Sequence, residues 1–290
     1  MNCIVLTSYN PEFLIVSLTS IRKVLERHKD KYFCLFVYND NPKHKLTIED
    51  IQYYITDELL YRHFIGIYNG TTNLRQFHAK VTAIELAYKF MHEERYYDIE
   101  YFTIVDEDDI LLEFNGNPGY LEINNKVLVA KSFRNLFSLI RNPKQIPSQV
   151  RDFGYTEGIA GNLYNMNEYI DFLQVIKGFF PKLHEIYGSD KIVNPDDYIL
   201  RNLWRSYLRW KYQKEDLSEF IIGGVHSYAV VDRKYRENEL DDIKTDRDIN
   251  DVNDIRYNSS LTSEEDYNRL WNLVDKIDNA FKSYLNQNQN

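Results

Sequence analysis

The feature that most constrains the fold is an apolar run at residues 101–105 that leads directly into four consecutive acids. A short apolar run of this kind predicts a strand buried on both faces, as in the middle of a parallel sheet. Ligands of open α/β sheets bind beyond the carboxyl ends of the strands, where these acids stand. Side chains alternate along an extended chain, so Asp106 and Asp108 form a D-x-D pair that suits a hard divalent cation. The alternative interpretation is a polar exit from a strand into a loop.

Before this strand, apolar strand-like runs alternate with helical stripes. Residues 4–8, 32–38 and 63–68 are expected to be strands, and apolar spacings of three and four residues predict helices near 14–25, 48–59 and 74–91. This alternation is typical of a parallel sheet with right-handed crossovers. Asn10 and Pro11 are expected to cap and start the first helix, and Thr47 the second. The sequence therefore predicts an α/β fold.

The second half of the chain is less regular. Residues 126–133 and 220–231 are strand-like, and helices are predicted for 167–180, from Asn194 or Asp196 onward, and after Ser263. We expect a main domain at 1–231, a charged linker or loop at 232–262, and a C-terminal helix with a frayed tail at 263–290. The last apolar stripe is regular enough either to dock on the body or to form a homodimer with a second copy.

Composition argues against several classes of protein. A net charge of −9 disfavours a broadly cationic surface for nucleic acid, although it leaves room for a local basic groove. The two cysteines, Cys3 and Cys34, have no metal or disulfide spacing, which predicts buried thiols in a reducing compartment. The chain opens without a basic leader, and no apolar run approaches the roughly 18 residues of a membrane span. We therefore expect a cytoplasmic protein with no membrane partner.

Five segments in one order resemble the family-2 glycosyltransferases with the GT-A nucleotide-diphospho-sugar transferase fold. They are IVLTSYN followed by Pro11-Glu12, FVYND, HAKVTAIELA, TIVDEDDIL and NPDDYILRNLW. These look like the family's opening strand, its second strand with a terminal acid, its Ala-Arg-Asn helix, its Leu-Asp-x-Asp-Asp motif and its Glu-Asp-x-x-Leu-x-x-Arg segment. The chain departs from the family where Lys80 and Val81 replace Arg-Asn and Asp196 replaces Glu. The resemblance is good over residues 1–112, patchy to 210 and absent beyond.

The resemblance implies a GT-A-like, mostly parallel central sheet flanked by helices, with a C-terminal helical extension. Residues 1–112 would bind the nucleotide-sugar, and 113–231 the acceptor. The implied enzyme is a metal-dependent, inverting glycosyltransferase that moves a hexosyl or pentosyl group from a UDP-sugar to a hydroxyl. Asp197 would be the general base, and Mn²⁺ or Mg²⁺ would be held by Asp106, Asp108 and His226. The residues implied in binding the donor are Thr7, Ser8, Tyr9, Asn10, Asp40, Lys80 and Asp106.

Each of these side chains also has a purely structural interpretation. Tyr9 and Asn10 would pack against and cap the first helix, and Asp40 would be a turn acid. The two acids that begin the helix at 196 would merely suit its dipole. Lys80 would lie on a solvated helix face, and His226 would be a structural histidine after a flexible pair of glycines.

A basic, aromatic stretch points to the acceptor. Arg201, Arg205 and Arg209 recur at four-residue spacing among aromatic residues, a pattern that can follow a phosphate backbone or hold a flipped base. Pairing of this face with the acids of 232–254 is the alternative. Three functions stay open: a sugar transferase for a glycan or small acceptor, one that modifies hydroxymethylated bases in viral DNA, and a non-glycosylating nucleotide-binding protein or nucleotidyltransferase. TSYNPE lacks the Gly-rich loop and basic residue usual in nucleotidyltransferases of this fold, which disfavours the third.

Overall fold

The central element of the fold is a five-stranded sheet with the order β3-β2-β1-β4-β7. The computed structural model describes residues 1–28, 33–55, 58, 63–95, 97–107, 110–111, 129–130, 159–160, 163–192, 196–217, 221–222, 228–229 and 264–288. The strands of the sheet are β1 (Asn2–Ser8), β2 (Phe33–Asn39), β3 (Phe64–Asn69), β4 (Tyr101–Asp106) and β7 (Leu163–Asn165). Strands β1 to β4 are parallel, and β7 runs antiparallel to β4.

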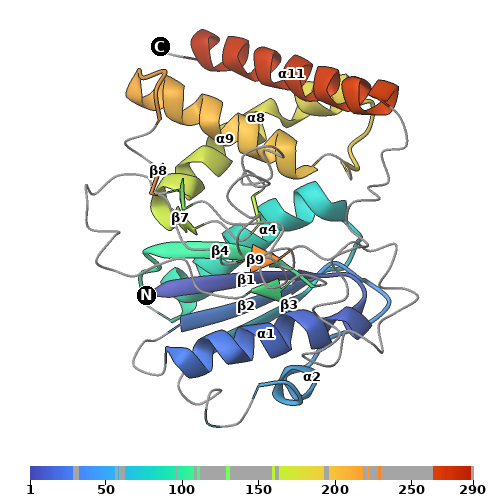
Figure 1. Ribbon diagram of the computed structural model, residues 1–290, viewed down its shortest axis with the longest axis vertical. Helices are drawn as coiled ribbons and strands as arrows, with labels where there is room; N and C mark the ends of the chain where they lie inside the picture. Colours follow the sequence, from blue (N-terminus) through green and yellow to red (C-terminus); the bar gives the residue numbers. More distant parts are fainter. Residues whose placement is uncertain are drawn as a thin grey trace, which may run out of the picture.

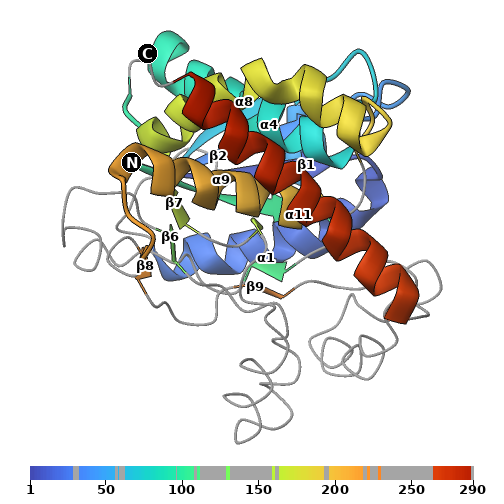
Figure 2. The ribbon, with the colours of Figure 1, turned by 90° about the horizontal axis from the view of Figure 1, so that it is seen from above.

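Helices cover both faces of this sheet (Figure 1). They are η1 (Pro11–Phe13), α1 (Leu14–Arg27), α2 (Ile48–Gln52), α4 (Arg75–Lys89), the π-helical turn η2 (Phe90–Glu94), α8 (Met166–Tyr187), α9 (Asp196–Tyr212) and α11 (Glu264–Gln287). Helix α1 lies on one face and α4 on the other, and α8, α9 and α11 form a further layer beyond α4 (Figure 1, Figure 2). None of the helices in the described ranges combines the length and apolarity of a membrane-spanning segment.

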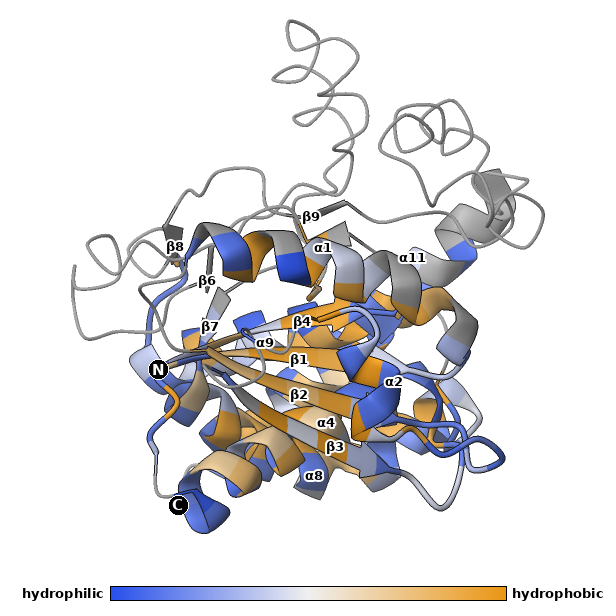
Figure 3. Cartoon of the chain, turned by 90° about the horizontal axis from the view of Figure 1, so that it is seen from below, coloured by the Kyte–Doolittle hydropathy of each residue, from blue (hydrophilic) through white to orange (hydrophobic). Residues whose placement is uncertain are grey.

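The two faces of the sheet carry separate apolar clusters. Cys3 and Val5 of β1 pack on the side of α4, while Ile4 and Leu6 pack on the side of α1. Every residue of β2 is buried, and the strands form an apolar centre between helices in Figure 3. Because both faces are covered, the strands are continuous apolar runs rather than alternating ones. The prediction of buried thiols is also confirmed, since Cys3 and Cys34 are free and buried.

Helix α11 docks on the body through the stripe that the sequence predicts. Its buried side chains are Val274, Ile277, Phe281 and Leu285. The rings of Phe281 and Phe179 of α8 have centroids 5.0 Å apart. This stripe is therefore occupied within the chain, and a homodimer through the C-terminal helix stays a prediction.

The predicted fold class, an α/β fold with a mostly parallel central sheet flanked by helices and a C-terminal helix, is confirmed. The helix predicted at 167–180 is longer than expected, because α8 continues past Pro181 to Tyr187. Burial of Phe179 and Leu183 on either side of the proline offsets the hydrogen bond that it removes. The helix ends at Gly188, whose φ of 82° closes it.

Other expectations are met only in part. Of the segment 220–231, β8 (Ile221–Ile222) pairs with β6 (Val129–Ala130), whereas β9 (Tyr228–Ala229) pairs with β5 (Ile110–Leu111). The two described parts of this strand-like run, which the sequence shows to be interrupted by Gly223-Gly224, thus belong to two separate small sheets. Asn10 and Pro11 occupy the expected N-cap and first positions, but of the 3₁₀ turn η1 that leads into α1, and the Asn10 side chain makes no capping hydrogen bond. Thr47, by contrast, forms the capping box of α2 with Asp50. Asn194, Ser263 and the linker at 232–262 lie outside the described residues.

Phe281→Ala tests whether α11 is part of the folded domain. Removing a fully buried ring leaves a cavity, so we expect the free energy of unfolding to fall by about 3–5 kcal/mol. Urea denaturation followed by circular dichroism measures it. The matched control is Lys276→Ala on the exposed side of the same helix, which should stay within about 0.5 kcal/mol of the wild type. Equal, small effects of both changes would contradict the docked arrangement.

Candidate functional site

The candidate site lies where the carboxyl ends of β1 and β4 meet. These strands are neighbours, yet the chain leaves β1 toward β2 on one side and enters β4 on the other. In open α/β sheets such a switch in strand order leaves a crevice that binds ligands. A cavity of about 150 Å³ opens there. Its lining residues are Thr7, Ser8, Tyr9, Asp40, Asn73, Arg75, Gln76, Ala79, Lys80, Asp106 and Glu107.

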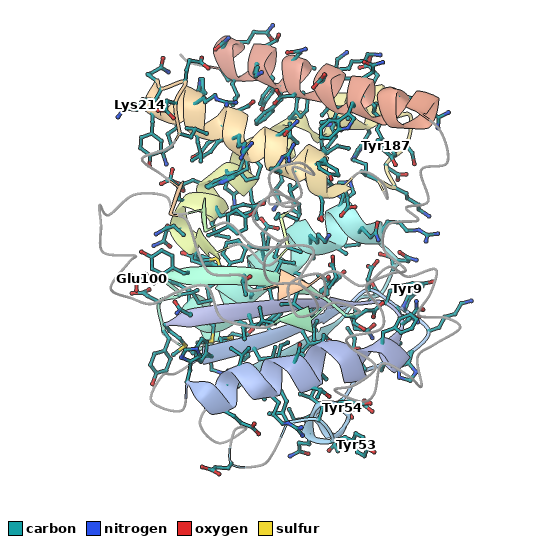
Figure 4. The ribbon with its side chains drawn as sticks, in the orientation of Figure 1. Tyr9, Tyr53, Tyr54, Glu100, Tyr187 and Lys214 are labelled. Carbon is teal, nitrogen blue, oxygen red and sulfur yellow. The ribbon has the colours of Figure 1, made fainter. Side chains whose placement is uncertain are left out.

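Most of the predicted site residues come together at this cavity. Those that line it are Thr7, Ser8, Tyr9, Asp40, Lys80 and Asp106. Tyr9 is 39% exposed and lies at the end of the sheet toward which the parallel strands run (Figure 4). Asn10 and Asp197 do not line the cavity but are bonded to residues that do. Asp108 and His226 lie outside the described residues.

Glu107 is one of the cavity residues that sequence reasoning missed, together with Asn73, Arg75 and Gln76. Its carboxylate accepts hydrogen bonds from Ser8 Oγ at 2.8 Å, from the Tyr9 backbone N–H at 2.6 Å and from the Asn10 backbone N–H at 2.8 Å. The start of a helix leaves backbone N–H groups without helical partners, and a carboxylate there also suits the dipole. Glu107 is 6% exposed, and these hydrogen bonds let it close the turn after β1 while it forms part of the cavity wall. The sequence did carry a signal for this role. Glu107 lies between the two Asp residues of D-x-D, and side chains alternate along an extended chain, so Glu107 is expected to point away from them.

Asp40 holds the start of α4 while forming part of the cavity wall. Its carboxylate accepts from the backbone N–H groups of Leu74 at 2.7 Å and Arg75 at 2.9 Å. Burial raises the pKa of Asp40 to about 6, although these two hydrogen bonds act in the opposite direction. Arg75 has a φ of 65°, in the left-handed region that non-glycine residues rarely adopt, and the Asp40 and Asn73 side chains hold its N–H. Contact of Asp40 with a uracil or ribose stays a prediction.

Lys80 joins two parts of the site that are distant in sequence. Its Nζ lies 3.2 Å from Asp106 Oδ2 at the end of β4, 2.9 Å from Asp196 Oδ2 and 2.7 Å from Asp197 Oδ1 at the start of α9. Lys80 is 3% exposed, so the interpretation as a solvated helix face is wrong. Burial alone would lower the pKa of Lys80, but the three carboxylates outweigh burial and raise it above its usual value. The Lys80 side chain is therefore protonated and positively charged.

Of the three predicted metal ligands, Asp106 alone lies within the described residues. No group of three His, Cys, Asp or Glu side chains within the described ranges is placed to bind a metal ion. Asp106 is the most exposed of the three acids around Lys80, at 28% of its side chain, and lines the cavity with a carboxylate that also accepts from Thr7 Oγ1 at 2.9 Å. Oxygen donors next to excess negative charge fit a hard cation. The Asp106 carboxylate thus offers oxygen donors that suit Mn²⁺ or Mg²⁺, and metal binding at this site stays a prediction.

The basic stretch of α9 is partly engaged within the chain. The Arg201 guanidinium lies 5.0 Å from the ring centroid of Tyr198 and 5.9 Å from that of Trp271. Arg209 Nε donates to the Glu215 carbonyl at 3.1 Å. The acids of 232–254 fall outside the described residues, so their pairing with this face stays a prediction.

Comparison with known proteins gives a likeness of structure alone. No protein-family model matches the sequence, and no curated protein matches it. Among solved structures, S. aureus TarS matches with a TM-score of 0.44 and 14% identity over 84% of this chain. Its 1–349 fragment matches with a TM-score of 0.47 and 12% identity, covering 95% of this chain and 80% of the fragment. The same fragment in complex with UDP-GlcNAc gives 0.45 and 12%, with the same coverage. The chain spans 38% of the length of TarS in the first of these structures.

Glu107→Gln tests the closure of the turn after β1. The amide nitrogen places a donor against backbone N–H donors, so we expect a loss of about 1–3 kcal/mol in the free energy of unfolding. Chemical denaturation measures this loss. Glu100→Gln is the matched control, because Glu100 is exposed at the opposite end of the sheet (Figure 4). A Glu107 variant as stable as the Glu100 variant would show that the turn does not depend on this carboxylate.

Proposed function

We propose that this chain is a metal-dependent glycosyltransferase that transfers a sugar from a nucleoside diphosphate donor, UDP in our assignment, to a hydroxyl acceptor. The observation that carries the proposal is that two carboxylates from separate elements lie close together at the point where the strand order of the sheet switches. Asp106 ends β4 and lines the cavity, and Asp197 begins α9, with an oxygen of each within 3.2 Å of the same Lys80 nitrogen. Inverting transfer needs both: one acid beside the leaving diphosphate and one beside the attacking hydroxyl.

The nucleoside end of the donor is assigned to the wall formed by the ends of β1 and β2. The half-exposed ring of Tyr9 offers a surface on which a base can stack, and the Asp40 carboxylate offers acceptor oxygens to a base imide or a ribose hydroxyl. Arg75 also lines the cavity and carries a permanent positive charge suited to a diphosphate. Thr7 and Ser8 supply hydroxyl groups to the same wall.

The diphosphate end is assigned to Asp106, together with Asp108 and His226 from the sequence. A bound Mn²⁺ or Mg²⁺ supplies Lewis-acid stabilisation of the departing diphosphate. Without a cation, the carboxylates of the cavity repel the phosphates. Asp106 would hold this cation, and the hydrogen bond that its carboxylate accepts from Thr7 Oγ1 fixes one of its oxygens.

The acceptor end is assigned to Asp197. Its carboxylate takes the proton from the acceptor hydroxyl as that oxygen forms the bond to the anomeric carbon and the bond to the diphosphate oxygen breaks. Attack from the side opposite the leaving group inverts the anomeric centre. A glycan or small-molecule acceptor is favoured over DNA, because Arg201 and Arg209 already contact groups of their own chain.

Isothermal titration calorimetry with UDP tests the proposal. We expect UDP to bind at least about tenfold more tightly with Mn²⁺ than without it, which corresponds to about 1.4 kcal/mol. Asp106→Ala should remove this dependence on the metal. Asp98→Ala is the matched control, because its side chain is 90% exposed and precedes β4. Equal affinity for UDP with and without Mn²⁺ in the wild type would contradict the proposed function.

A further inference from the structure

The ammonium of Lys80 is surrounded by acids from two separate elements. An ammonium has three N–H donors and no acceptor. Three carboxylates lie within 3.2 Å of Nζ: Asp106 from β4, and Asp196 and Asp197 from α9. The donors and the carboxylates therefore match in number, and a phosphate oxygen would have to displace one of these acids to reach Nζ. This geometry disfavours the direct donor-binding role that the family resemblance implies for Lys80.

The position of Lys80 is fixed by the packing of its helix. Its neighbours Ala79 and Val81 are buried against the body of the protein, and the Phe77 N–H donates to the Ile192 carbonyl at 3.3 Å, just before α9. The lysine stem is likewise buried. Helix α4 thus holds a positive charge at one point between β4 and α9. Because the ammonium is covalently attached to the chain, it cannot dissociate into solvent as a bound metal ion can.

We propose that Lys80 is a built-in cation that takes the place of a second metal ion and positions the donor-side carboxylate Asp106 against the acceptor-side carboxylates Asp196 and Asp197. The inference rests on the proposed function and deepens it. Three carboxylates that share one small volume repel one another unless a cation lies between them. The ammonium removes this repulsion and sets the distance between the acid that faces the diphosphate and the acid that faces the attacking hydroxyl. Lys80 itself touches neither substrate.

Manganese binding without any nucleotide tests the cation role directly. Lys80→Met keeps the length of the side chain and removes its charge, which leaves three acids around an empty position. Counting bound Mn²⁺ by electron paramagnetic resonance, we expect this variant to bind one more ion per chain than the wild type. Lys80→Arg, which keeps the charge, and Lys89→Met, on the exposed end of the same helix, should bind as the wild type does. An unchanged Mn²⁺ count in Lys80→Met would overturn the proposal.

A charge-balanced double variant keeps the test decisive if Lys80→Met does not fold. Lys80→Met with Asp196→Asn removes one positive and one negative charge, so the net charge of the cluster is unchanged. We expect this protein to bind UDP and Mn²⁺ within about threefold of the wild type, but to lose about 10²-fold in kcat, the scale expected for a misplacement of about 1 Å. The single variant Lys80→Arg, which keeps the positive charge, should have a kcat between those of the double variant and the wild type. Full turnover by the double variant would overturn the positioning role.

The two failures remain distinguishable. If the wild type does not bind UDP, the proposed function fails, while the Mn²⁺ count still reports whether Lys80 stands in for a cation. If UDP and metal bind as expected and the Mn²⁺ count of Lys80→Met does not rise, the proposed function survives and the role of Lys80 as a cation is refuted.

Discussion

The site depends on how five buried or half-buried carboxylates are accommodated at one end of a sheet. Asp40 is satisfied by backbone N–H groups at the start of α4. Glu107 is satisfied by a side-chain hydroxyl and by backbone N–H groups at the start of the first helix. Asp106, Asp196 and Asp197 instead share the ammonium of Lys80. An unpaired charge in such a place would be strongly destabilising. These contacts therefore help to fix how β1, β4, α4 and α9 are arranged relative to one another.

The packing of the sheet and the helices holds the elements that carry these carboxylates in place. The sheet is buried on both faces, which fixes the ends of β1 and β4 relative to each other. Helix α9 carries Asp196 and Asp197 at its first turn and is held further along by α11, where Ser206 Oγ donates to Asp278 Oδ1 at 2.6 Å. The C-terminal helix thus stabilises the helix that carries Asp196 and Asp197, and none of its described residues lines the cavity. This explains why an apolar stripe so far along the chain bears on a site built largely from the first 107 residues and α9.

Local patterns in the sequence were sufficient for the parallel strands β1 to β4 and for the residues at their carboxyl ends, but they did not predict β7. An apolar run followed by acids marks the end of a buried strand, so Asp106, Ser8 and Tyr9 could be placed at one edge of the sheet. The partners of these residues could not be predicted in this way, because they lie far away in sequence. Glu107 contacts residues 97–99 positions earlier, and Lys80 contacts acids 116–117 positions later.

Lys80 shows where the sequence did carry a usable signal. It lies three residues after Phe77 and four before Ile84, on the buried stripe of α4, yet a charged residue on a helix is ordinarily assigned to its solvated face. Such a lysine requires buried acids, and Asp196-Asp197 was available as a second acidic pair. The cavity residues Asn73, Arg75 and Gln76 gave no such signal, because the turn before α4 is shaped by Asp40 from another strand.

The central claim is that the carboxyl-end cavity binds a nucleoside diphosphate through a cation held by Asp106. The most direct measurement is a crystal structure of the protein with UDP and Mn²⁺, in which the anomalous scattering of manganese locates the ion. We predict an anomalous peak bound to Asp106, with the diphosphate beside it and the uracil next to Tyr9 and Asp40. UDP bound outside this cavity, or manganese bound away from Asp106, would contradict the claim.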